Sequence, residues 1–164
     1  MDLSLFAFIG VCFLAALSGA LFQPGAWYEA LKKPVWRPPN WVFGPVWTVL
    51  YGMIAFAGWR VWQAAGPGEA TVPMIVYGVQ LVLNFAWSWV MFGLRRIGWA
   101  LVEIGALWLS ILATILVFYP IDAAAAWMLL PYLAWASFAA VLNAAVWRRN
   151  RDRPPGGVAE GLGR

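Results

Sequence analysis

The chain has 164 residues, of which 63% are hydrophobic and only 11% are charged. Water-soluble globular domains carry more charge and less apolar surface, and thirteen Trp, ten Phe and five Tyr would leave large exposed apolar patches unless lipid covered them. The net charge is +4, and the absence of histidine together with a single cysteine, Cys12, argues against a disulfide framework, a cysteine metal site and histidine-dependent catalysis within one chain.

Five apolar runs are long enough to cross a bilayer as helices, because the hydrocarbon core requires about 20 apolar residues per helix. The predicted spans are residues 3–22, 41–63, 71–94, 98–119 and 123–147. The first run is preceded by Asp2 and by no lysine or arginine, whereas a cleaved signal peptide needs a basic start, so we interpret it as a span. The sequence therefore predicts an all-α membrane protein, a bundle of five transmembrane helices within residues 1–150.

Basic residues gather in the connections on one side of these spans, and Asp2, Glu69 and Asp122 lie on the other side. Under the positive-inside rule this pattern predicts an external N-terminus and a cytoplasmic C-terminus, and it favours a bacterial cytoplasmic membrane. An even number of spans would not agree with this distribution of charge, so the charge pattern supports five spans. Residues 151–164 are predicted to be a disordered, Pro- and Gly-rich basic tail rather than a nucleic-acid patch. The basic residues are Lys32, Lys33, Arg37, Arg95, Arg96, Arg148, Arg149, Arg151 and Arg153.

The connection between the first two spans, residues 23–40, reads QPGAWYEALKKPVWRPPN. Its Pro-Gly start predicts a turn, residues 26–33 predict a short amphipathic helix, and three later prolines hold the remainder extended. Trp27, Tyr28 and Trp36 suit a membrane interface, where an apolar ring keeps its polar group in water. The alternative is a structured lid that covers the cytoplasmic mouth of the bundle and controls access to a pocket.

Polar side chains recur along one face of the third span, where Gln80, Asn84 and Ser88 are four residues apart and Trp87 lies beside them. Polar groups at membrane depth require a partner or a function. The aromatic neighbours favour a pocket role for Asn84, whereas for Asn143 in the fifth span an interhelical hydrogen bond that fixes packing is an equal alternative.

Aromatic stripes on two other spans point to the same pocket. One stripe has the three- and four-residue spacing of a single helix face in the fifth span, and the other is an aromatic pair in the second span. Their convergence with the polar patch predicts a ligand site. The stripes consist of Tyr132, Trp135, Ala139 and Leu142, and of Trp47 and Tyr51.

Two charged residues lie within the predicted spans. Arg60 is close enough to the outer end of the second span to reach the interface, and Glu103 lies shallowly in the fourth span, where we expect it to pair with Arg95 or Arg96. One carboxylate without a histidine or a second acid is a weak indication of a proton relay.

Three stretches of the chain resemble the TspO/MBR family, the tryptophan-rich sensory proteins related to the mitochondrial translocator protein or peripheral benzodiazepine receptor. They read WYEALKKPVWRPPNWVFGPVWTVLYGMIAFAGWRVW from Trp27, QLVLNFAWSWVMFG from Gln80 and LLPYLAWASFAAVLN from Leu129. The resemblance extends to about Asn150 and implies a five-helix bundle, commonly a homodimer, that binds protoporphyrin IX, heme or other tetrapyrroles, with sterols and benzodiazepine-type drugs bound by some members. Some members occur in outer membranes.

The resemblance also implies a pocket made by the loop and by the second, third and fifth spans, and it implies no required cofactor or metal. Two departures bear on function. Val35 replaces the first of two adjacent loop tryptophans of some bacterial members, and alanine replaces a tyrosine of the animal sterol-recognition stretch within residues 142–149. The implied ligand-binding residues are Trp27, Trp36, Trp41, Phe43, Trp47, Tyr51, Asn84, Trp87, Trp135, Ala139 and Leu142.

These patterns lead to three hypotheses about function. The leading one is a membrane receptor or carrier that binds a tetrapyrrole or another amphipathic small molecule between its helices, for sensing or transport. The second is light-dependent porphyrin degradation by redox chemistry at Trp36 and Trp47. No other catalytic group is evident, because the sequence has no pair of nucleophile and base and no phosphate loop. The third is a structural or regulatory membrane partner whose aromatic residues only anchor and pack.

Overall fold

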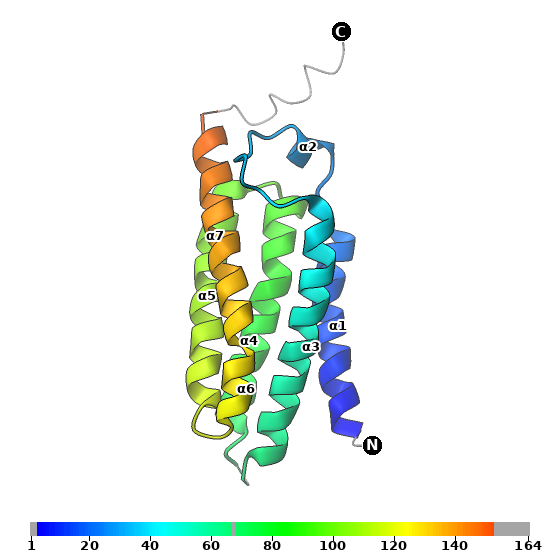
Figure 1. Cartoon of the computed structure of the whole chain (residues 1–164), viewed down its shortest axis with the longest axis vertical. Coiled ribbons are helices and arrows are strands. Elements are labelled where there is room, and N and C mark those ends of the chain that lie inside the picture. Colours follow the sequence, from blue (N-terminus) through cyan, green and yellow to red (C-terminus); the bar gives the residue numbers. More distant parts are fainter. Residues whose placement is uncertain (1–2, 67, 153–164) are drawn as a thin grey trace.

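A computed structural model of the chain describes residues 3–66 and 68–152, and these residues form an elongated helical bundle (Figure 1). Five helical segments are long and apolar enough to cross a membrane, which confirms the predicted fold class. Most of the tail predicted at 151–164 lies outside the described residues. The helices are α1 (Leu3–Leu21), α2 (Ala26–Glu29), α3 (Asn40–Ala64), α4 (Thr71–Ser88), a π-helical turn (Trp89–Gly93), α5 (Ile97–Phe118), α6 (Ala123–Met128) and α7 (Leu130–Asn150).

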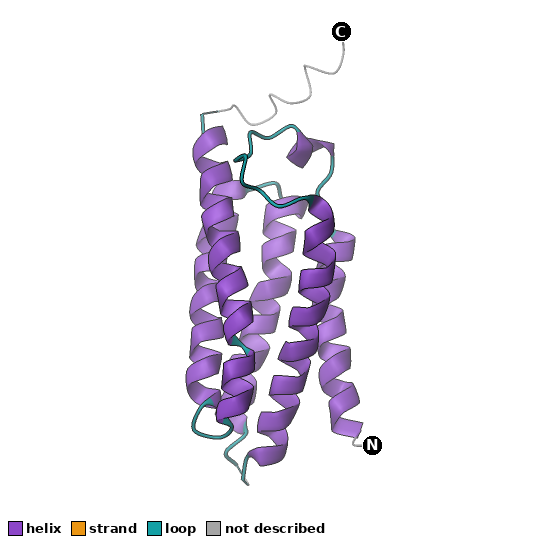
Figure 2. Ribbon diagram, viewed as in Figure 1, coloured by secondary structure: helices purple, strands orange, loops and turns teal. Residues whose placement is uncertain are grey.

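The helices pack around a shared apolar core in which α1 contacts α3 and α4, and α5 contacts α4 and α7. The short helix α2 and the loops that flank it lie across the end of the bundle where α7 ends, opposite the N-terminus (Figures 1 and 2). The segment 23–40 therefore covers one end of the bundle, as expected of a lid. We call residues 23–39 the lid.

The predicted fifth span is divided in two, because α6 ends at Met128 and α7 begins at Leu130. Pro131, in the first turn of α7, has no backbone N–H to donate to Trp127 four residues earlier, so the hydrogen-bond ladder is interrupted at this point. Beyond the break, Ala136 of α7 is buried in the core.

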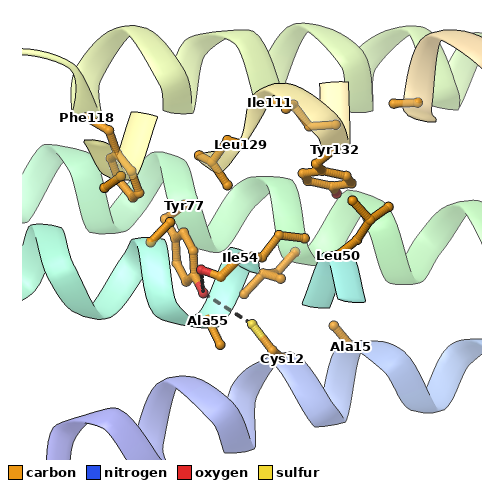
Figure 3. Packing of buried hydrophobic residues seen from close by; sticks show 14 of the residues in the cluster. Cys12, Ala15, Leu50, Ile54, Ala55, Tyr77, Ile111, Phe118, Leu129 and Tyr132 are labelled. Carbon is orange, nitrogen blue, oxygen red and sulfur yellow. Dashed lines mark hydrogen bonds between the residues drawn. The ribbon is translucent and has the colours of Figure 1, made fainter. Parts of the chain in front are cut away.

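A hydrogen-bonded group joins α1, α3 and α4 in the middle of the core (Figure 3). The Tyr77 hydroxyl donates to the carbonyl of Ile54 at 3.2 Å, and the Cys12 sulfur lies 3.2 Å from the same hydroxyl oxygen. The Tyr77 ring also stacks on Phe118 of α5, with ring centroids 6.0 Å apart. The Tyr77 hydroxyl and the Cys12 thiol are thus paired within the protein, as burial in a membrane bundle requires.

The charged side chains expected inside the spans behave differently from one another. Arg60 pairs with Asp122, with its Nε 2.8 Å from Oδ2, and Asp122 Oδ1 accepts the Ala125 N–H at 3.1 Å, which caps α6. The expected pairing of Glu103 with Arg95 or Arg96 is wrong, because both Glu103 oxygens are buried without a hydrogen-bond partner among the described residues. The Arg95 guanidinium instead lies 6.0 Å from the centre of the Trp27 ring.

Candidate functional site

A cavity of about 350 Å³ lies beneath the lid, between α1, α3, α4 and α7. Its walls are mostly apolar and aromatic, with a small number of polar side chains, which is the composition of small-molecule sites. The lining residues are Ala16, Gly19, Phe22, Pro24, Tyr28, Asn40, Phe43, Gly44, Trp47, Trp87, Ser88, Met91, Phe92, Ala139, Leu142, Asn143 and Val146.

A second cavity of about 90 Å³ lies against the first and shares several wall residues with it, among them Trp47, Trp87 and Ala139. Ile104 and Leu107 of α5 close its far side. The two cavities therefore form one site that extends from the lid into the bundle.

The structure brings together eight of the eleven sequence-predicted ligand residues. Five border the larger cavity and three border only the smaller one, so α3, α4 and α7 each contribute. The residues at the larger cavity are Phe43, Trp47, Trp87, Ala139 and Leu142, and those at the smaller are Tyr51, Asn84 and Trp135.

The three tryptophans predicted from the loop region border neither of these two cavities. Trp41 is 74% exposed, and Trp36 is 47% exposed and packs edge-on against Phe138 with ring centroids 6.0 Å apart. The Trp27 ring faces the Arg95 guanidinium, as described above. Of the two candidate photochemical residues, Trp47 thus borders the site, 5.4 Å from the Tyr51 ring centroid, whereas Trp36 lies outside it.

Asn84 is part of a hydrogen-bond chain that crosses the bundle. Its Oδ1 accepts from the Tyr51 hydroxyl, its Nδ2 donates to the Tyr132 oxygen at 2.8 Å, and the Tyr132 hydroxyl donates to Gln80 Oε1 at 3.0 Å. Both ends of the Asn84 amide therefore have protein partners, and the chain ties α3, α4 and α7 together at the wall of the smaller cavity.

Two other polar atoms on cavity-lining residues have no such partners. Asn143 Oδ1 and Trp87 Nε1 are buried, and no described residue forms a hydrogen bond with either atom. One is an acceptor and the other is a donor. Within the described residues there is also no group of three or more Cys, Asp or Glu side chains arranged to hold a metal ion.

The lid is fastened to α7 through Asn150. The Lys32 backbone N–H donates to Asn150 Oδ1 at 3.0 Å, and Asn150 Nδ2 donates to the Lys32 carbonyl at 2.9 Å. Asn150 is 7% exposed, so water competes weakly for these bonds. We call this pair of bonds the latch.

The underside of the lid contributes Tyr28, whose side chain borders the larger cavity. Burial raises the pKa of the Tyr28 hydroxyl, and a hydrogen bond with Arg37 partly offsets that rise, so the hydroxyl keeps its proton at neutral pH. On the outer side, a hydrogen bond from Asn40 and nearby basic groups lower the pKa of Glu29. Glu29 is therefore ionised at neutral pH, and Asn40 links it to the start of α3.

Several wall residues lie outside the set predicted from the sequence. Met91 and Phe92 lie in the π-helical turn, which has an extra residue per turn and which no sequence period predicts. Gly19 and Gly44 leave the wall open because nothing lies within 4 Å of the position of an added Cβ. The sequence predicts Tyr28 only as an interfacial aromatic residue, because its position in the loop does not indicate that it faces inward.

The chain is similar in sequence to a known family of proteins. A sequence profile of the TspO/MBR family matches residues 8–148. Protein CrtK of Rhodobacter capsulatus is 39% identical over 157 residues, covering 94% of this chain and 98% of the relative. A tryptophan-rich sensory protein of Cereibacter sphaeroides is 41% identical over 94% of this chain and 96% of its own length. The human translocator protein is 44% identical over 84% of each chain.

Proposed function

Since this chain belongs to the TspO/MBR family, we propose that it is a membrane receptor or carrier whose ligand, a tetrapyrrole such as protoporphyrin IX or heme, or another flat amphipathic molecule, binds in the cavity beneath the lid. The observation that carries the proposal is the cavity itself, walled by Phe43, Trp47 and Trp87. Aromatic rings provide large, flat apolar surfaces against which a planar macrocycle packs.

The lid explains how a large ligand would reach a site of this size. A cavity of about 350 Å³ is at the lower end of the range for small-molecule sites, so a tetrapyrrole enters edge first and the lid moves to accommodate the remainder. Lys32, Lys33 and Arg37 in the lid place positive charge at the mouth, where carboxylate groups of the ligand would lie. Sensing or transport then follows from the response of the lid to occupancy.

The test is a titration of the full chain, in lipid nanodiscs, with protoporphyrin IX while the tryptophan emission is followed. We expect saturable quenching in the micromolar range for the wild type. Gly44→Leu, which fills the cavity, should weaken the affinity by about tenfold or more, a loss of about 1.4 kcal/mol per factor of ten.

Gly52→Leu is the matched control, because Gly52 is on the same helix, has nothing within 4 Å of an added Cβ, and does not border either cavity. It should bind as the wild type does. Equal, non-saturating quenching in all three proteins would mean that the porphyrin only partitions into lipid, and the proposal would be rejected.

A further inference from the structure

Asn143 is held in one orientation at the wall of the larger cavity. It is 3% exposed, and its Nδ2 donates to the carbonyl of Ile97, the first residue of α5, at 3.1 Å. Rotating the amide by half a turn would bring two acceptor oxygens together, so the bond to Ile97 fixes which end is which. Oδ1 is thereby left as an acceptor that no described residue satisfies.

An unsatisfied acceptor in this position weakens the folded protein, because a buried polar atom has lost its water without gaining a partner. Asn84 shows that the same bundle can satisfy both ends of an amide, through Tyr51 and Tyr132. The contrast suggests that Asn143 serves a molecule other than the protein. Trp87, which borders the same cavity, has the complementary unpartnered group, the Nε1–H donor.

We propose that Asn143 determines ligand specificity, selecting flat aromatic ligands that present an N–H or O–H group to its Oδ1, and that Trp87 Nε1–H receives an acceptor of the same ligand. This inference rests on the proposed function, since it assigns the polar contacts of that cavity. Both atoms are covered by neighbouring side chains, so the ligand must displace these as it binds. A fully apolar ligand would leave both atoms unpaired, and an ionised carboxylate placed at Oδ1 would be repelled.

Three probes of nearly identical shape separate these contacts. Carbazole carries an N–H donor, fluorenone carries a carbonyl acceptor, and fluorene carries neither. Their association constants with the full chain in nanodiscs are measured by calorimetry, after subtraction of the heat of partition into protein-free nanodiscs. One neutral hydrogen bond predicts that carbazole and fluorenone each bind the wild type about three- to tenfold more tightly than fluorene.

Two variants are then expected to have opposite effects on these binding ratios. Asn143→Leu should reduce the carbazole-to-fluorene ratio to about one and leave the fluorenone-to-fluorene ratio unchanged, and Trp87→Phe should do the reverse. A purely structural role for either residue would shift all three probes together, which would overturn the proposal. Asn143→Ala replaces Asn143→Leu if the larger side chain prevents folding, and a wild-type carbazole-to-fluorene ratio near one overturns the assignment of Asn143 without any variant.

Different experimental results would reject the role of Asn143 and the tetrapyrrole site. Saturable protoporphyrin binding that Gly44→Leu weakens, together with a carbazole preference that survives Asn143→Leu, would reject the role of Asn143 and keep the tetrapyrrole site. A carbazole preference lost in Asn143→Leu, together with protoporphyrin that only partitions into lipid, would support the role of Asn143 and reject the tetrapyrrole.

Discussion

At the scale of single residues, Gly58 of α3 lies where side chains of α1 and α4 pack directly against its backbone. A Cβ on Gly58 would lie 2.7 Å from Tyr77 Cζ and 2.9 Å from Phe8 Cδ1, closer than such atoms approach in proteins. Small residues permit this kind of contact between membrane helices, where packing replaces the hydrophobic effect as the driving force. Any side chain at this position must displace the Tyr77 ring and disturb its bonds to Cys12 and Ile54.

We therefore expect Gly58→Ala to lower the free energy of unfolding by about 1–3 kcal/mol, the usual cost of overpacking a core. Reversible unfolding in mixed micelles, followed by circular dichroism, measures the change. Gly52→Ala is the control, because it adds the same methyl group to the same helix where nothing lies within 4 Å. Equal stability of the two variants would contradict this account of the close approach.

The polar residues show how far a sequence can be interpreted at this scale. Helical spacing placed Asn84 and Trp87 toward the interior, and both border the cavities. Spacing could not show that the Asn84 amide is fully partnered while Asn143 Oδ1 is not, because the partners come from other helices. The sequence did not predict that Trp27, Trp36 and Trp41 lie outside both cavities. Trp27 and Trp36 belong to the lid, where no long helical period indicates direction, and Trp41 lies in the first turn of α3.

At the scale of elements, the latch is one of the contacts that hold the lid over the cavity, beside the packing of Tyr28 and Leu31 against the bundle. Both of its bonds join the Asn150 side chain to backbone atoms of Lys32, and a third bond from Asn150 Nδ2 to the Val146 carbonyl, at 2.7 Å, orients the amide on α7. The latch thus depends on a single side chain.

Asn150→Ala removes both bonds, and at about 0.5–1.5 kcal/mol for each neutral hydrogen bond we expect the Lys32 amide to exchange with solvent about tenfold faster or more. Hydrogen–deuterium exchange of the full chain in nanodiscs measures the effect. Asn150→Asp keeps the acceptor for the Lys32 N–H and loses the donor, so it should give an intermediate rate. Exchange at an unchanged rate in Asn150→Ala would show that other contacts hold the lid.

The elements themselves were largely predictable because length and apolar content determine which segments cross a membrane. The boundaries of α3 and α4 agree with the predicted spans to within a residue at their N-terminal ends. Local backbone detail was not predictable from hydropathy. The break between α6 and α7 and the π-helical turn at Trp89–Gly93 do not alter the apolar content of their spans.

At the scale of the whole molecule, charge is distributed unequally between the two ends of the bundle. The lid carries Lys32, Lys33 and Arg37 against one acid, Glu29, which pairs with Lys33 at 3.6 Å, while at the far end Arg60 is neutralised by Asp122. Net positive charge therefore remains at the lid end. Under the positive-inside rule, this asymmetry predicts that the lid faces the cytoplasm.

A membrane-impermeant maleimide applied to intact cells tests this orientation. We expect Glu69→Cys, in the connection between α3 and α4, to be labelled from outside. Lys32→Cys should be labelled only after the membrane is permeabilised. The native Cys12 provides little background because it is 2% exposed. The opposite labelling pattern would show that the lid faces outward.

The helix α7 contacts the lid through Asn150 and forms part of the cavity wall through Leu142, Asn143 and Val146. A ligand that favours the latched arrangement by some factor must be bound more tightly, by the same factor, once the lid is latched, because the two equilibria share one thermodynamic cycle. Any molecule that binds the end of α7 at the membrane surface and changes the latch therefore also changes the affinity of the cavity for its ligand. Conversely, occupancy of the cavity is signalled at the surface as a change in how often the lid is open.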